Sequence, residues 1–199
     1  MSVLWIFLVR LDFLLFLFIV SVGSMPIAED RTQNSPVAGY WLTRKDDTNL
    51  PSSVIHLSVD EDGQMAGQVI VGFYETDAPL PSKICRKCSS KTADGRFGLN
   101  KKQAIVGSYS VWGFNKKSET SWVNGKVIRV KTGQLFSADL ALREQNSLAV
   151  KVRYGIFSTT LLWERLTDSE VQSICSGNVS KITDYQDVKA FCVPDLKKK

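Results

Sequence analysis

Two cysteines separated by two residues, Cys85 and Cys88, are the side chains whose type and spacing most directly suggest chemistry. A C-x-x-C pair can form a thiol-exchange centre, half of a zinc site or a structural disulfide. Thioredoxin-type exchange needs a helix N-terminus within a βαβ unit, whereas the flanking residues here predict coil between antiparallel strands. Zinc needs about four ligands, and His56 is the only histidine in the chain. The pair is therefore predicted to form a structural disulfide.

The other two cysteines, Cys175 and Cys192, lie near the C-terminal end of the chain. An even number of cysteines is typical of exported proteins, because disulfides persist in oxidising compartments. Four cysteines allow three pairings, and proximity in sequence favours Cys85 with Cys88 and Cys175 with Cys192.

No other group of residues indicates a reaction. His56 has no nucleophile that the sequence pairs with it, and the paired acids Asp46/Asp47 and Asp60/Glu61/Asp62 fall at expected turns, where Asp is favoured. No phosphate-binding loop or dinucleotide fingerprint occurs. We expect no catalysis, no cofactor and no metal, and thiol exchange through the C-x-x-C pair is the remaining enzymatic alternative.

The N-terminal residues indicate export. An unbroken apolar run, residues 13–22, follows Arg10 and precedes Gly23 and Ser24, which is the pattern of a secretory signal peptide. We predict a signal peptide over residues 1–24 and a mature protein in the bacterial periplasm or outside the cell. Retention as a membrane anchor is the alternative, although Arg10 and Asp12 shorten the continuous apolar run.

The charge of the chain argues against nucleic acid as a partner. The formal net charge is +5, but no basic stripe with interleaved aromatic residues lies on any one element. Weak association with an anionic envelope surface stays open.

From residue 37 onward the apolar residues alternate with polar ones, which predicts β-strands. The eight expected strands are residues 37–44, 53–60, 64–74, 104–114, 124–131, 134–142, 147–155 and 159–166. Eight antiparallel strands in up-and-down order hide their edges by closing into a barrel. We predict an all-β domain over residues 37–166 whose interior is either filled by side chains or holds one small ligand.

Two further segments stand apart from the strand pattern. Thr167 with Glu170, and Thr183 with Gln186, have the spacing of a helix capping box, so residues 167–199 are expected to form a short helical C-terminal appendage. The connection over residues 75–103 is far longer than a normal strand linker, which is typical of a lid or a binding loop.

The two ends of the expected barrel carry a recognisable combination of residues. Gly39-x-Trp41 lies in the first strand and Trp163-x-Arg165 in the last, so Arg165 can lie over the Trp41 indole. This combination resembles the lipocalin (calycin) signature, which concerns structure rather than activity.

The order of motifs along residues 37–166 also resembles a family of uncharacterised exported bacterial proteins with no established enzymatic activity. The resemblance implies a lipocalin-like barrel that binds a small apolar molecule. The matching residues are Gly39, Trp41, Cys85, Cys88, Gly107, Trp122, Gly125, Gly133, Phe136, Trp163 and Arg165.

Two hypotheses for function follow. The first is an exported binding protein for a small hydrophobic ligand, held inside the barrel or under the long loop; Tyr109, Trp112, Phe136 and Tyr154 are the candidate ligand contacts. The second is an envelope structural or interaction protein with a filled barrel. A cavity or a bound ligand distinguishes the two.

Overall fold

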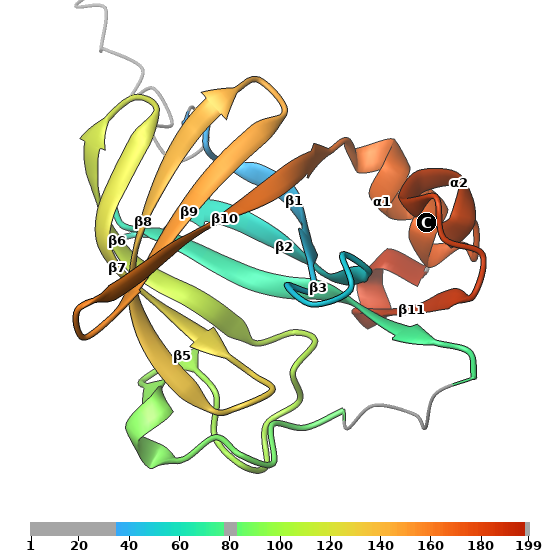
Figure 1. Cartoon of the computed structure of the whole chain (residues 1–199), viewed down its shortest axis with the longest axis horizontal. Helices are drawn as coiled ribbons and strands as arrows, with labels where there is room; N and C mark the ends of the chain where they lie inside the picture. Colours follow the sequence, from blue (N-terminus) through green and yellow to red (C-terminus); the bar gives the residue numbers. More distant parts are fainter. Residues whose placement is uncertain (1–34, 78–82, 198–199) are drawn as a thin grey trace, which may run out of the picture.

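The alternating residues form long antiparallel strands around one apolar interior (Figure 1). The computed structural model describes residues 35–77 and 83–197, and the signal peptide predicted over residues 1–24 lies outside these ranges. The barrel strands are β1 (Gly39–Arg44), β2 (Pro51–Val59), β3 (Met65–Glu75), β6 (Tyr109–Ser118), β7 (Ser121–Arg129), β8 (Gln134–Glu144), β9 (Ser147–Tyr154) and β10 (Phe157–Leu166).

Strand pairing closes the sheet. Each of these strands pairs with its neighbours in chain order, β1 pairs with β10, and β3 pairs with β6. The predicted eight-stranded antiparallel barrel is therefore confirmed.

The first half of β3 contacts β6 and its second half contacts another strand. At the change, the Val69 N–H donates to Ser108 O at 2.9 Å and the Gly107 N–H donates to Val69 O at 2.7 Å. The backbone of Gly107 and Ser108 is hydrogen-bonded to Val69 and does not continue the β6 ladder. Strand β6 therefore begins at Tyr109 rather than at residue 104 as predicted. From Val71 onward β3 is free to pair elsewhere.

The edge that β6 leaves is taken by β11 (Val188–Cys192), which pairs with β3 from Val71 to Glu75. A helix was predicted here from Thr183 and Gln186, and that prediction is wrong. Helix α2 (Val179–Thr183) already ends at Thr183, because Asp184 takes a left-handed backbone conformation with φ of 60°. The chain then runs extended along β3, where its backbone groups find partners.

The first predicted helix of the appendage is present. Helix α1 (Asp168–Cys175) begins with the expected capping box, in which the Thr167 hydroxyl accepts from the Glu170 N–H and the Glu170 carboxylate accepts from the Thr167 N–H. With α2 and β11, it covers a second apolar cluster on the outer face of β1 to β3, at the right of Figure 1. No helix within residues 35–77 and 83–197 is long and apolar enough to cross a membrane.

The long connection between β3 and β6 contains short elements of its own. These are the 3₁₀ turn η1 (Ser90–Thr92), β4 (Ala93–Asp94) and β5 (Phe97–Gly98); a second 3₁₀ turn, η2 (Pro194–Lys197), ends the described chain. β5 pairs with the start of β6, so the connection continues the sheet beyond the barrel.

Candidate functional site

One end of the barrel is closed by Arg165. Its guanidinium lies 4.2 Å from the centroid of the Trp41 ring, in the arrangement expected from the sequence. Nη1 donates to Ala38 O at 2.9 Å, Nε donates to Gln145 O at 2.8 Å, and Nη2 donates to Pro36 O. Burial lowers the pKa of Arg165, but a guanidinium stays charged at neutral pH. One cation thus ties the entering chain to the β8–β9 turn.

Gly39 leaves room for this cation. Its φ is +124°, and a Cβ at this position would lie 2.8 Å from Arg165 Nη1. Trp41 is fully buried, and its indole N–H donates to Val37 O at 2.9 Å. The G-x-W spacing therefore places a bulky ring inside the barrel and a residue without a side chain beneath the guanidinium.

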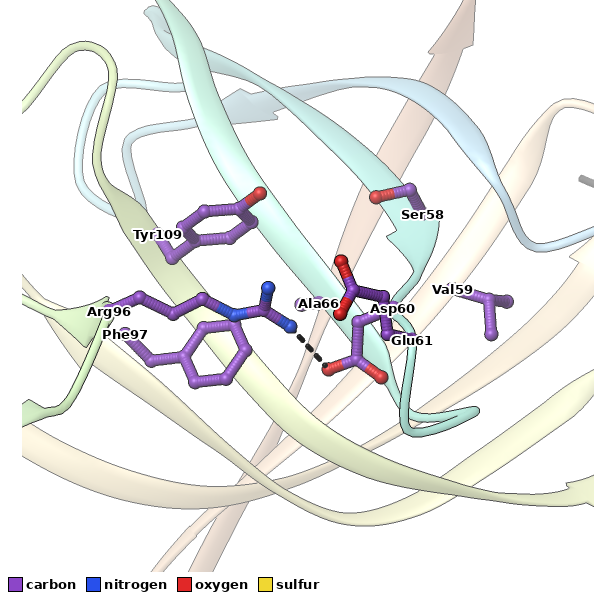
Figure 2. A pocket seen from close by; sticks show the side chains of 8 residues that line it. All are labelled: Ser58, Val59, Asp60, Glu61, Ala66, Arg96, Phe97 and Tyr109. Atoms are coloured by element: carbon purple, nitrogen blue, oxygen red, sulfur yellow. Dashed lines mark hydrogen bonds and ion pairs between the residues drawn. The ribbon is translucent and has the colours of Figure 1, made fainter. Parts of the chain in front are cut away.

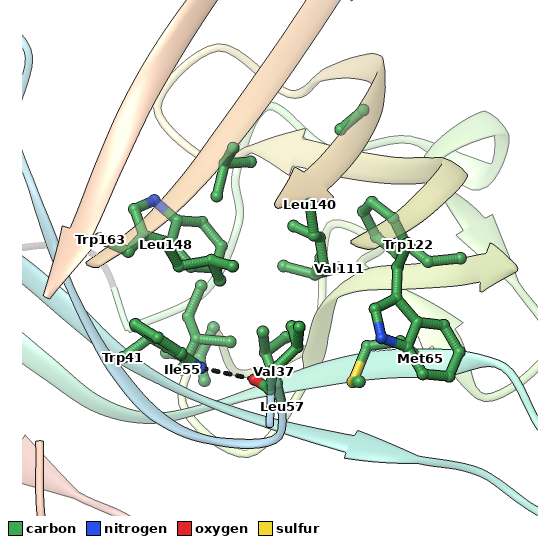
Figure 3. Packing of buried hydrophobic residues seen from close by; sticks show 14 residues of the cluster. Val37, Trp41, Ile55, Leu57, Met65, Val111, Trp122, Leu140, Leu148 and Trp163 are labelled. Atoms are coloured by element: carbon green, nitrogen blue, oxygen red, sulfur yellow. Dashed lines mark hydrogen bonds between the residues drawn. The ribbon is translucent and has the colours of Figure 1, made fainter. Parts of the chain in front are cut away.

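The interior next to this closed end is filled by side chains (Figure 3). Trp41, Trp122 and Trp163 are buried together, and the Trp122 indole N–H donates to Ser35 Oγ at 3.2 Å. A side chain that lines a void large enough for water has accessible surface that faces the void. Ten members of the cluster have no accessible surface: Val37, Trp41, Leu57, Met65, Val111, Phe114, Ala138, Leu140, Leu148 and Val150. These residues enclose no space for a ligand.

Gly125, three residues after Trp122, contributes to this packing. A Cβ at Gly125 would lie 2.2 Å from the Phe114 ring, so the glycine lets the ring lie flat against β7.

At the opposite end of the barrel, the open end, the inward apolar side chains are only partly buried. Val127, Phe136, Val152 and Leu161 alternate with residues of the outer face and follow the filled layers toward this end, and each is only partly buried. The Phe136 and Tyr154 rings lie 5.6 Å apart. Tyr154, a candidate ligand contact, is 57% exposed, because it is the last residue of β9 and extends past the last packed layer. This open end is a ring of apolar, half-covered side chains.

An ion pair on the outer wall braces the strands beside the open end. Arg153 Nη1 and Nη2 donate to the two carboxylate oxygens of Asp139 at 2.6 and 2.9 Å, and the Asn124 N–H donates to Asp139 at 3.0 Å. The Arg153 hydrogen bonds are the main cause that lowers the pKa of Asp139.

The long loop lies against the outside of the barrel. Cys85, Cys88 and Leu99 pack on the outward faces of Trp112 and Ile128. This part of the loop therefore covers the wall formed by β6 and β7, whereas Ile105 and Val106, at the end of the same connection, pack against the interior cluster.

The structure pairs Cys85 with Cys88 and Cys175 with Cys192, the pairs that proximity favoured. Cys85 is 1% exposed and Cys88 is 0% exposed. A thiolate must reach a sulfur atom for exchange to occur, so this geometry favours a structural role over thiol exchange. The second disulfide joins the end of α1 to the end of β11 and holds the appendage together.

The four candidate ligand residues separate into two pairs. Phe136 and Tyr154 lie at the open end, whereas Tyr109 and Trp112 lie outside the barrel with Phe97 of the long loop. The Phe97 ring meets Tyr109 edge-on at 5.3 Å and stacks on Trp112 at 6.5 Å. Trp112 is 3% exposed. Tyr109 and Trp112 therefore anchor the loop. Of the four candidates, Phe136 and Tyr154 are the two that a ligand at the open end can contact.

Polar contacts continue this outer cluster. The Trp112 indole N–H donates to Asp94 at 3.4 Å, and Lys126 donates to the same carboxylate at 3.0 Å. Both hydrogen bonds lower the pKa of Asp94, Lys126 more than Trp112.

A hollow of about 300 Å³ lies beside the same cluster (Figure 2). It is lined by Ser58, Val59, Asp60, Glu61, Ala66, Arg96, Phe97 and Tyr109. The Arg96 guanidinium lies 4.8 Å from the Phe97 ring centroid and pairs with Asp60 at 3.5 Å. Asp60 also accepts from the Asp62 and Gln64 N–H groups at 3.1 and 2.9 Å, as expected for an acid at a turn. The Asp60 carboxylate is thus paired with groups of the protein itself.

His56 lies on the outer face of β2, with its ring 4.6 Å from that of Tyr40. Burial is the main cause that lowers the pKa of His56, and Asp168 at the start of α1 opposes the shift. The histidine therefore packs beneath the appendage. Within the residues that the structure describes, no three His, Cys, Asp or Glu side chains gather closely enough to hold a metal ion.

The strand order and the Trp41–Arg165 contact define a lipocalin-like barrel. The sequence also matches a family model described as "Uncharacterized protein conserved in bacteria (DUF2147)" over residues 39–165. The chain belongs to this bacterial family.

A solved structure has the same fold. It is the Helicobacter pylori protein HP1028, described as belonging to the lipocalin family, with a TM-score of 0.52, 16% identity, and coverage of 81% of this chain and 97% of that chain. No curated protein matches the sequence significantly.

Several features of the site were not found from the sequence. The Asp139–Arg153 and Asp60–Arg96 pairs join residues from different strands and loops, so no local pattern reveals them. Ile156 and Phe157 are exposed at the turn between β9 and β10. The sequence does carry a local signal for them, because an apolar pair follows Gly155 at a tight turn where polar residues are usual.

Proposed function

We propose that the protein is an exported binding protein that holds a small apolar molecule at the open end of its barrel. The observation that carries the proposal is the contrast within the interior. Residues near Trp41 are packed without space, whereas Val127, Phe136, Val152 and Leu161 are apolar, directed inward and only partly covered. Apolar surface left exposed in this way gains free energy when a ligand removes it from water.

The geometry also limits the ligand. Because Leu140, Leu148 and Val150 are fully buried next to the open end, a ligand enters only the layer of side chains nearest that end. Aromatic rings at Phe136 and Tyr154 suit a flat or short apolar group, and the Tyr154 hydroxyl can bind a polar atom at the surface. The proposed class is thus a small, largely apolar molecule rather than a long lipid chain held along the barrel axis.

Export is part of the same proposal. Two disulfides are stable in an oxidising compartment, and residues 1–24 have the pattern of a signal peptide. The mature protein is proposed to act in the periplasm or outside the cell.

The test is a fluorescence titration with the apolar probe phenylnaphthylamine. Val152→Trp fills the open end, and we expect it to weaken probe binding about tenfold or more, as expected when a pocket is occupied by a bulky side chain. Lys151→Trp is the matched control, because it adds the same side chain to the outer face of β9. Equal binding by both variants and the parent protein would place the probe elsewhere and refute the proposed site.

A second candidate function is an interaction protein whose barrel serves only as a scaffold. The complete packing around Trp41, Trp122 and Trp163 favours it. If the parent protein binds no probe and carries no small molecule from its native compartment, this second function replaces the first.

A further inference from the structure

Apolar side chains project from the turn between β9 and β10. Ile156 is 93% exposed, Phe157 is 73% exposed and Tyr154 is 57% exposed. Tyr154 pairs with Phe157, so Gly155 and Ile156 form a two-residue turn, in which Gly155 has φ of 59°. Residues 154–157 form the hairpin tip.

The turn itself does not require this exposure. A tight hairpin with glycine at the first central position accepts a polar residue at the second, and polar residues are usual there. Placing Ile156 and Phe157 in water has no benefit for folding. Exposed apolar groups gathered at one projecting point mark an interaction surface.

Basic residues surround the same end of the barrel. Residues 83–102 of the long loop contain seven Lys or Arg residues and one Asp. Arg96 pairs with Asp60 in the turn between β2 and β3, so the basic surface is formed by the other six. The loop reaches the β7–β8 turn, where a Cβ on Gly133 would lie 2.1 Å from Lys87 O. Lys131 in that turn has a side chain 85% exposed.

Strand register brings this basic surface and the tip to one end. Arg129 pairs with Gln134, and Ser137 pairs with Arg153, so the β7–β8 turn and the hairpin tip both end at the open side of the barrel. In Figure 1 the hairpin tip projects at the lower left and the long loop lies at the bottom. The acids nearby, Asp46 and Asp47, pair with Arg129 and Lys131, and the loop lysines supply the surplus positive charge.

We propose that the hairpin tip inserts into the surface of a bilayer containing anionic phospholipids, with the basic loop against the headgroups. Aromatic and branched apolar side chains are favourable at the boundary between headgroups and hydrocarbon, and Lys and Arg residues are attracted to anionic lipid. One apolar anchor binds a membrane weakly, and a polybasic surface is the second signal that makes the binding stable. The open end of the barrel then faces the bilayer. The docking rests on this surface alone and does not depend on the ligand proposed above.

The first test compares variants of the full chain for binding to vesicles of phosphatidylethanolamine and phosphatidylglycerol. We expect the double variant Ile156→Ser/Phe157→Ser to bind about tenfold more weakly or worse, because both anchors are lost. Leu162→Ser is the control: it removes an apolar side chain that is 64% exposed on the same hairpin but lies away from the tip. Binding should also weaken at high salt and on phosphatidylcholine vesicles.

The second test detects insertion directly. Tryptophan is introduced at Ile156 in one variant and at Leu162 in another, and lipids with brominated acyl chains quench only tryptophans within the bilayer. We expect strong additional quenching for Ile156→Trp and none for Leu162→Trp. All variants retain residues 1–34, so any binding by that segment is equal among them and does not produce this difference.

Equal vesicle binding by the parent and the serine double variant, or equal quenching at both positions, would overturn the docking. Self-association that the double variant abolishes, without quenching, would assign the tip to a second copy of the chain and also overturn it. Val152→Trp should bind vesicles normally, so loss of probe binding and loss of docking are separate results.

Discussion

At the scale of single residues, two contacts determine how the barrel closes. Arg165 spans the chain entering β1 and the turn between β8 and β9, and Trp41 fills the space beneath it. The Arg165 contact depends on a small neighbour, since Gly39 makes room for the guanidinium. A few residues therefore determine how the chain packs at the closed end of the barrel.

Truncating Trp41 tests that role. Trp41 is fully buried, so Trp41→Ala should lower the free energy of unfolding by about 3–5 kcal/mol, as large aromatic truncations in cores do. Urea denaturation of the parent and the variant measures the difference. A loss below about 1 kcal/mol would show that the ring does not support the closed end.

The Asp139–Arg153 pair makes a prediction about pH. Arg153 lowers the pKa of Asp139 below its ordinary value of 3.8, so the pair's contribution is present above about pH 4 and is lost as pH falls through the lowered pKa. Asp139→Asn should cost about 1 kcal/mol at pH 7 and progressively less as the pH falls below about 4. Thermal unfolding across this range measures it, and a constant difference between the two proteins would contradict the assignment.

At the scale of elements, β3 organises the molecule because it serves two neighbours. Its first half closes the barrel with β6, and its second half pairs with β11. The appendage is thus an extension of the sheet, which the Cys175–Cys192 disulfide holds against α1.

Removing that disulfide tests the element. A loop of this length, with a sequence separation of 17, contributes about 3 kcal/mol by chain entropy. Cys175→Ser/Cys192→Ser should therefore release β11, with faster hydrogen exchange along Val188–Cys192 and at the second half of β3, while β6 to β9 stay protected. Uniform protection in the variant would show that packing alone holds the appendage.

Most elements could be predicted from the sequence, because their apolar periodicity reflects contacts with one nearby core. The alternation of Phe136, Ala138 and Leu140 predicts β8, and the Thr167–Glu170 spacing predicts α1. The strand β11 could not be predicted in this way. Thr183 and Gln186 have capping spacing, but an open edge on β3, more than a hundred residues earlier in the chain, decides the conformation.

At the scale of the whole molecule, the two ends of the barrel differ in packing. The end held by Arg165 is filled around three tryptophans, with Ala38, Val59 and Leu142 partly buried at its rim, and the end beside the hairpin tip leaves Val127, Phe136, Val152 and Leu161 partly buried. The candidate site was only partly predictable for the same reason. Phe136 and Tyr154 lie at the open end, but Tyr109 and Trp112 are taken by the long loop, and whether a loop packs over a wall or a mouth depends on the folded surface.

Methyl NMR during addition of phenylnaphthylamine shows directly which part of the barrel binds the probe. Val127, Val152 and Leu161 at the open end should shift with increasing probe, and Leu57, Leu140 and Leu148 in the filled half should not. Shifts throughout the filled half, or none at the open end, would contradict a barrel that binds its ligand at one end.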